Sequence, residues 1–263
     1  MADQIQVVTP EICAPVFTPN AIDTVSNRYQ HLSTINIVDV CRDGGWEVVS
    51  TAAQRVRNEA RQGFQKHFVN MRFGRATLQV GDCEMRMMLV NSHDGLSSVS
   101  LFAGLFRKVC MNGLHVDAGM FAAIRIRHTN TALQESVLLG ANKIAALAPA
   151  MDEQIKKMQE FELTPEQQRL FAQDAIKVIW PNKDSTYVKA ENLLQARRPL
   201  DGGNSLWTTY NTVQENATKG GISTLSDNGR SRSSRRIVSP SRDLSVNTGL
   251  FGLAVQVMEK ANG

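Results

Sequence analysis

The spacing of apolar residues changes near residue 131, and this change constrains the fold of the 263-residue chain more than any other feature. Before it, short apolar or alternating segments are separated by turn formers, which is typical of antiparallel strands. After it, apolar residues recur every three or four positions, as in amphipathic helices. We therefore predict an α+β fold, with a mostly antiparallel N-terminal sheet and a short helix, followed by a helical C-terminal half. The expected strands lie at residues 46–49, 68–73, 85–90 and 123–127, separated by turn formers that include Asp43-Gly44-Gly45, Asp94-Gly95 and Asn112-Gly113.

Capping residues and prolines predict where the helices begin and end. Ser33 or Thr34 can cap an early helix that stops at Gly44-Gly45. From residue 131 to about 161 only Pro149 interrupts the helical pattern, which predicts two helices or one bent helix. Thr164-Pro165-Glu166 has the form of a helix start, and Pro181 closes that helix. Further helices are expected at residues 190–197, 205–219 and 241–260, and the Gly-, Ser- and Arg-rich stretch between residues 220 and 241 predicts a long surface loop.

The composition is that of an ordinary folded protein, with 42% hydrophobic and 21% charged residues. No linker-like tract divides the chain, so we expect a single domain over residues 1–263, with a sheet-rich half at 1–130 and a helical half at 131–263. The chain lacks an apolar run of 18 residues and a signal sequence, which predicts a cytoplasmic protein with no membrane partner. The four cysteines form no C-x-x-C pair, and we expect buried free thiols.

Basic residues recur with a period of two along the predicted strands, although the net charge of +4 is too small to identify a partner. A period of two places such residues on one face of a sheet, where guanidinium and ammonium groups suit a phosphate backbone and aromatic rings can stack on unpaired bases. The alternative is a solvated outer face of a half-buried sheet. The basic residues are Arg55, Arg57, Lys66, Arg72, Arg125 and Arg127, and the nearby aromatic residues are Phe64, Phe68 and Phe73.

A second basic feature lies in the predicted loop, where residues 230–236 contain four arginines. From Arg197 to Arg242 the chain has eight basic and three acidic residues. Arg232, Arg235 and Arg236 are therefore expected to contact phosphates as an auxiliary clamp, giving affinity without sequence readout. The alternatives are a solvated loop and arginines that pair with acids elsewhere.

The segment Asn91-Ser92-His93-Asp94-Gly95 has the most site-like composition, because a strand ends there in a polar turn. A nuclease can use a histidine as base and an aspartate as metal ligand. However, the chain has no H-E-x-x-H, D-x-D, G-x-S-x-G or P-loop motif, and Asx-turn hydrogen bonds by Asn91 and Asp94 are the more common explanation. We therefore expect no catalytic residue, no metal and no cofactor.

Several ordered motifs resemble one family. They are RYQHLSTINIVDVCRDGGWEVV, then RVR and GFQKH, then LVNSHDG, GLFRKVCMNGL, LWTTYNTVQENATKGG and DLSVNTGLFGLA. From about Arg28 to Ala254 the chain resembles the phage- and plasmid-like proteins grouped as domain of unknown function 932. Members of that family are carried on mobile elements, and the resemblance implies a role in the DNA metabolism of such elements.

Among such roles, sequence-independent binding and ATP-independent annealing of single-stranded DNA fits the basic residues best, by an analogy of class with the annealing proteins of phages. This function predicts single-stranded nucleic acid as the partner, with the protein assembled as a ring or filament larger than a dimer. Two alternatives remain. One is an interaction protein that acts on a host defence or replication factor, and the other is a metal-dependent nuclease centred on His93 and Asp94.

Overall fold

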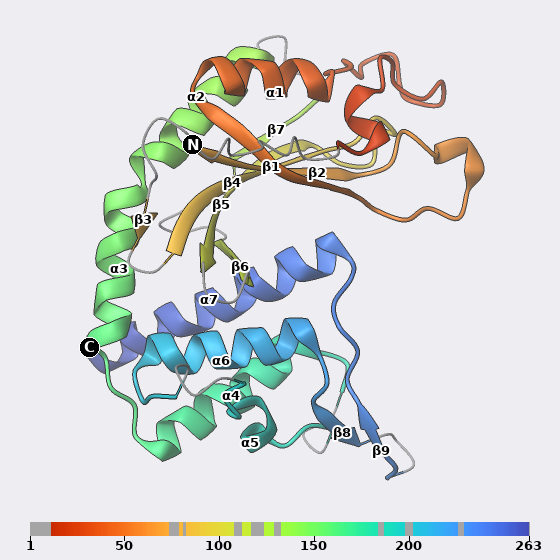
Figure 1. The fold of residues 1–263 in the computed structure, drawn as a ribbon. Coiled ribbons are helices and arrows are strands. Elements are labelled where there is room, and N and C mark those ends of the chain that lie inside the picture. Colours follow the sequence, from red (N-terminus) through yellow and green to blue (C-terminus); the bar gives the residue numbers. More distant parts are fainter. Residues whose placement is uncertain are drawn as a thin grey trace, which may run out of the picture. The chain divides into compact units, whose positions relative to one another are not determined.

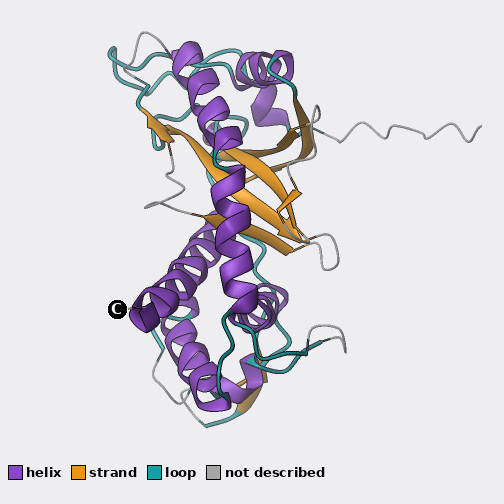
Figure 2. Ribbon diagram, turned by 90° about the vertical axis from the view of Figure 1, so that its left-hand side faces the viewer, coloured by secondary structure: helices purple, strands orange, loops and turns teal. Residues whose placement is uncertain are grey.

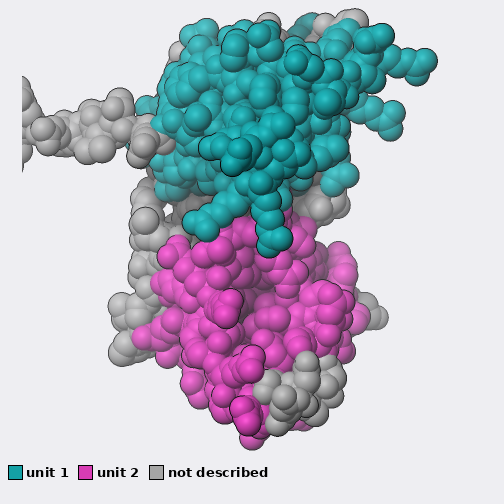
Figure 3. All heavy atoms as spheres, turned by 90° about the vertical axis from the view of Figure 1, so that its right-hand side faces the viewer, with its two compact units in different colours: residues 1–77, 86–102, 123–145 teal, residues 78–85, 103–122, 146–263 magenta. Residues whose placement is uncertain are grey.

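The computed structural model describes residues 12–73, 79–80, 83–107, 112–116, 124–128, 133–183, 187–197, 202–225 and 229–262. Contacts within the chain divide it into two compact units (Figure 3). Unit 1 comprises residues 1–77, 86–102 and 123–145, and unit 2 comprises residues 78–85, 103–122 and 146–263. Two of the boundaries fall inside strands and one falls inside a helix, so the units do not coincide with the sheet-rich and helical halves expected from the sequence.

The N-terminal half forms the expected sheet (Figure 1). Its strands follow the order β1-β2-β4-β5-β6, with β3 paired to β4 and β7 paired to β5. The pairs β1–β2, β2–β4, β5–β6 and β5–β7 are antiparallel, and β1 has a register shift between Val48 and Ser50. The strands are β1 Trp46–Ala53, β2 His67–Phe73, β3 Gln79–Val80, β4 Cys83–Asn91, β5 Val99–Arg107, β6 Asn112–Val116 and β7 Ile124–Ile126.

The sequence pattern missed β3, β5 and β6, and the expected turn at Asn112-Gly113 is wrong. These two residues pair with Arg107 and Phe106 at the start of β6. Asn-Gly favours a turn, but ladder hydrogen bonds to a neighbouring strand override that local preference here.

Two helices of unit 1 support the sheet. The α1 helix spans Thr34–Asp43, and it buries Ile37, Val38 and Cys41 while Gly44 caps its C-terminal end, close to the predicted boundaries. The α2 helix spans Leu133–Ala146. Gly140 lets α2 approach the sheet closely, because a Cβ atom there would lie 2.7 Å from Leu101 Cδ1.

The C-terminal half is mostly helical, as predicted (Figure 2). Pro149 lies in the first turn of α3, so the chain divides into α2 and α3 at this point. The Thr164 hydroxyl accepts a hydrogen bond from Gln167 N, and Thr164 N donates one to Gln167 Oε1, which makes a capping box at the start of α4. The helices of unit 2 are α3 Ala148–Glu160, α4 Pro165–Ile179, α5 Ala190–Leu193, α6 Leu206–Lys219 and α7 Pro240–Asn262.

The expected long loop between residues 220 and 241 instead contains a β-hairpin, formed by β8 Ser223–Leu225 and β9 Ser231–Ser233. The hairpin starts where Gly220 turns the chain with a φ of 69°, and a Cβ atom there would lie 2.6 Å from the backbone of Arg235. Backbone hydrogen bonds from Gly221 N to Ser234 O and from Ile237 N to Thr218 O attach the segment to the end of α6. The polar composition therefore marks an exposed hairpin, because backbone pairing does not require apolar side chains.

The described helices include none that is long and apolar enough to cross a membrane. Of the cysteines, Cys41 is buried and free, and burial raises the pKa of its thiol to about 12. Cys13 is free but only half-buried, which differs from the expectation. The side chains of Cys83 and Cys110 lie outside the described part of the chain.

Candidate functional site

The connection between β1 and β2 carries three of the predicted basic residues. The strand β1 ends at Ala53 and β2 begins at His67. Arg55, Arg57 and Lys66 therefore lie in this connection, whereas the period of two had predicted that they lie on strand faces. A short 3-10 helix, η2 Glu59–Arg61, interrupts the chain there and is capped by the Asn58 side chain. The strand periodicity fails because this local turn replaces the pleat.

The same connection folds around a pocket of about 530 Å³ in unit 1. Four basic side chains line it, those of Arg55, Arg57, Arg61 and Lys66. The remaining lining residues are Gln54, Val56, Asn58, Gln65, Asp94, Leu96 and Ser97. We call this cavity the basic pocket.

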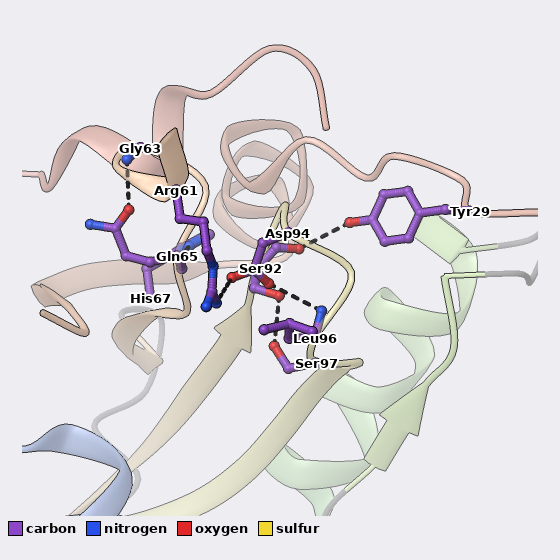
Figure 4. A network of polar contacts seen from close by, with 9 residues as sticks. All are labelled: Tyr29, Arg61, Gly63, Gln65, His67, Ser92, Asp94, Leu96 and Ser97. Carbon is purple, nitrogen blue, oxygen red and sulfur yellow. Dashed lines mark hydrogen bonds and ion pairs between the residues drawn. The ribbon is translucent and has the colours of Figure 1, made fainter. Parts of the chain in front are cut away.

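Asp94 is the one carboxylate among the described residues of the basic pocket, and it is already neutralised. Arg61 Nη2 lies 2.5 Å from Asp94 Oδ2, and the Asp94 side chain is only 3% exposed (Figure 4). Burial by itself raises the pKa of Asp94, but hydrogen bonds from Arg61, Leu96 N and Ser92 outweigh it and hold that pKa below its ordinary value. Arg55, Arg57 and Lys66 form no ion pair with any described residue, so the pocket keeps an excess of positive charge.

The turn that carries Asp94 is fixed from several sides. Leu96 N donates to Asp94 Oδ1 at 3.1 Å, which is the Asx turn expected from the sequence. His93 N donates to Phe64 O, and Ile22 N donates to His93 O. The loop opposite is also braced, because Gly63 N donates to Gln65 Oε1 (Figure 4). The basic pocket is therefore lined by two mutually bonded loops.

His93 lies in a buried cluster and not in the pocket. Its imidazole has no solvent exposure, stacks at a tilt against His31 and His67, and places Nε2 3.1 Å from Pro15 O. Burial, followed by the neighbouring imidazoles of His67 and His31, lowers the pKa of His93 to about 3. This arrangement offers no support for His93 as a base. Within the described residues no group of three His, Cys, Asp or Glu side chains is placed to hold a metal ion.

Arg72, Phe64 and Phe73 do not join Arg55, Arg57 and Lys66 in the basic pocket. Arg72 pairs with Glu47 on the adjacent strand at 2.9 Å, and both side chains are about half exposed. Phe73 packs edge-on against Trp46, with ring centroids 5.3 Å apart. Phe64 is half-buried, and its backbone bonds to Arg61 and His93.

Arg125 and Arg127 line a second pocket in unit 1, of about 580 Å³. Arg125 lies on β7 and Arg127 just after it; both are exposed, while Ile126 between them is buried. The predicted alternation therefore holds here. Lys143 of α2 lines the same pocket, and no sequence signal marks it, because a lysine on a helix is normally a solvated surface residue.

The remaining predicted residues belong to unit 2. Arg232 lies on β9 opposite Thr224, and Arg232, Arg235 and Arg236 are all exposed. In contrast to these exposed arginines, Arg197 donates to Asn216 Oδ1 and Gly220 O, so its side chain stabilises the C-terminal end of α6.

Fold and site together define an α+β protein with basic pockets beside an antiparallel sheet. The family model described as "Domain of unknown function (DUF932)" matches residues 21–246, and the chain belongs to this family, which confirms the resemblance noted from its motifs. It is similar to UPF0380 protein YafZ and UPF0380 protein YfjQ of Escherichia coli (strain K12). Each is 31% identical over 239 residues, which cover 91% of this chain and 86% of the relative. No solved structure matches the chain.

Proposed function

We propose that this protein binds single-stranded nucleic acid without sequence preference, chiefly DNA, and anneals complementary strands during recombination of a phage or other mobile element. The observation that carries the proposal is the basic pocket, which Arg55, Arg57 and Lys66 line without an ion pair to any described carboxylate while Arg61 neutralises Asp94. Such cations attract phosphates and release the counterions condensed on them.

The second pocket supports the same function. Arg125, Arg127 and Lys143 line it, and the described residues of its lining include no acidic side chain. Two cationic pockets in one unit suit a polymer with repeated phosphates better than a single small anion. Arg232, Arg235 and Arg236 are proposed as a further set of phosphate contacts in unit 2.

Cations that line pockets, most of them exposed, favour a single strand over a duplex. A single strand is flexible enough to direct successive phosphates into pockets, and its bases are free to contact neighbouring side chains. Annealing needs no nucleotide hydrolysis, and the chain has no P-loop motif. Assembly larger than a dimer belongs to the same proposal, because adjacent subunits would extend the binding track.

The test measures binding of a fluorescent poly-dT strand to the full chain at several salt concentrations, together with native mass of the complex. Replacing Arg55, Arg57 and Lys66 with alanine is expected to weaken binding by at least about tenfold and to reduce the log–log salt slope by about 2, at roughly 0.7 per lost phosphate contact. The fold should remain, because surface substitutions usually change stability by no more than about 0.5 kcal/mol.

A matched control removes the same amount of charge elsewhere. Lys156, Arg169 and Lys177 are cations of α3 and α4 that pair with acids on their own helices. Their triple alanine variant should bind nearly as the wild type does. No binding by the wild type at about 50 mM salt would reject nucleic-acid binding, since screening is weak there. A strictly monomeric mass with DNA present would reject annealing and leave the interaction-protein alternative.

A further inference from the structure

A second, smaller cavity adjoins the basic pocket and differs from it in charge. Its volume is about 290 Å³, and it shares Leu96 and Ser97 with the basic pocket. Its other side chains come from Ser26, Tyr29, Ser98 and His128, so none of the described residues that line it is an Asp, Glu, Lys or Arg. We call this cavity the neutral pocket. A phosphate has no cation to meet there, whereas an uncharged group with hydrogen-bonding edges meets hydroxyls and an apolar surface.

His128 does not supply a positive charge to the neutral pocket at neutral pH. Its ring stacks on Tyr29 with centroids 4.4 Å apart, and its Nδ1 lies 3.1 Å from Gln30 O. Burial is the largest influence on the imidazole and lowers the pKa of His128 below its ordinary value of 6.5. Tyr29 is half-buried, and its hydroxyl donates to Ser92 O at 3.0 Å, which fixes the ring (Figure 4).

Leu96 stands between the two pockets and is 70% exposed. The turn that carries it is rigid, because Asp94 accepts from Leu96 N and is itself bonded to Arg61 (Figure 4). Gly95 has a φ of 74°, and its Cα faces Val25 so closely that a Cβ atom there would lie 3.1 Å from Val25 Cγ1. A leucine held in water on a rigid turn is positioned before any ligand arrives, which lowers the entropy lost on binding.

We propose that the neutral pocket receives a nucleobase of the bound single strand, with Leu96 and Tyr29 contacting the base while Arg55, Arg57 and Lys66 hold the adjoining phosphate. This inference rests on the proposed function and adds that the two pockets bind different parts of the strand, the neutral pocket a base and the basic pocket a phosphate. The base contacts are apolar and hydroxyl contacts that any base can make, so binding depends on the presence of a base and not on its identity.

The test compares two strands of equal length and charge, poly-dT and a strand of abasic sites, each titrated into the full chain. The wild type is expected to bind poly-dT more tightly than the abasic strand. Leu96→Ser should weaken poly-dT binding by about fivefold, in line with the loss of one exposed apolar contact, and leave abasic binding and the salt slope unchanged. Ser26→Trp, which introduces bulk at the exposed rim, should have the same selective effect.

Leu170→Ser is the control, since Leu170 of α4 is 50% exposed and lies in unit 2. Equal binding of poly-dT and the abasic strand by the wild type overturns the base-pocket proposal while leaving nucleic-acid binding intact. Equal weakening of both strands by Leu96→Ser also overturns it, because the leucine would then support only the fold of the turn. Failure of the wild type to bind either strand overturns both proposals.

Discussion

Thr34 connects the buried polar side chains of unit 1 and is itself fully buried. Its Oγ1 lies 2.7 Å from His67 Nε2 and accepts from Asn91 Nδ2 at 2.8 Å. His67 Nδ1 faces Gln65 O, so that nitrogen carries the proton and Nε2 accepts from the Thr34 hydroxyl. One hydroxyl therefore satisfies two buried side chains that come from different strands.

Replacing Thr34 with valine is expected to destabilise the protein by about 2 kcal/mol. Valine keeps the shape but leaves His67 Nε2 and Asn91 Nδ2 with one partner fewer, and an unsatisfied buried polar group costs about 1–3 kcal/mol. Urea unfolding followed by circular dichroism measures this change. Thr34→Ser, which retains the hydroxyl, should lose less than half as much. A valine variant as stable as the wild type would show that the hydroxyl is not the connecting group.

At the scale of elements, the contact between α4 and α7 depends on one glycine. A Cβ atom on Gly249 would lie 2.6 Å from Val178 Cγ1 of α4, whereas a Cβ atom on Gly252, one turn further along α7, would meet nothing within 4 Å. Both glycines carry the same conformational cost within a helix. They differ in the space that the neighbouring helix leaves.

Gly249→Ala is therefore expected to destabilise the protein by about 1–3 kcal/mol through overpacking, and Gly252→Ala to stabilise it by up to about 1 kcal/mol through the higher helix propensity of alanine. Thermal unfolding of the two variants measures both signs. Adding Val178→Ala to the Gly249→Ala variant should recover part of the loss. Equal effects of the two glycine substitutions would contradict the close approach of α4 and α7.

At the scale of the whole molecule, buried titrating groups make stability depend on pH. Burial is the main reason that four histidines, His31, His67, His93 and His128, have pKa values below the ordinary value of 6.5. The pKa of His67 falls to about 4 and that of His93 to about 3. The unfolded chain takes up protons near pH 6.5 and the folded chain only at lower pH, so the free energy of unfolding falls as pH falls from about 6.5 to about 3. Asp243 acts in the opposite direction, because burial raises its pKa to about 6 and the folded state takes up that proton first.

We expect a net loss of several kcal/mol of stability between pH 7 and pH 4.5, because the effect of four histidines is larger than that of one aspartate. His67 by itself contributes on the order of 3 kcal/mol as the pH falls from its unfolded to its folded pKa. Urea unfolding at each pH is the measurement. Asp243→Asn removes the opposing group, so its loss of stability on acidification should be steeper than that of the wild type. A constant free energy of unfolding over this range would show that the histidines are accessible to protons in the folded state.

The amino-acid sequence by itself determined the features that depend on neighbouring residues. It predicted the α+β class, a bend or division of the helical segment at Pro149, the capped start of α4 at Thr164 and the Asx turn at Asp94. Each of these follows from hydrogen bonds or backbone restrictions within a few residues, which is the range over which sequence periodicity and capping motifs carry information.

Only the tertiary structure decided which cations remain available and where they gather. Arg61 pairs with Asp94 across 33 residues, and Arg72 pairs with Glu47 across 25, so two cations that look alike in the sequence are already neutralised. The neutral pocket likewise brings together Tyr29, Leu96 and His128 from three separate segments. Charge pairing and pocket formation depend on distances in space between residues that are distant in the chain, and local periodicity does not encode those distances.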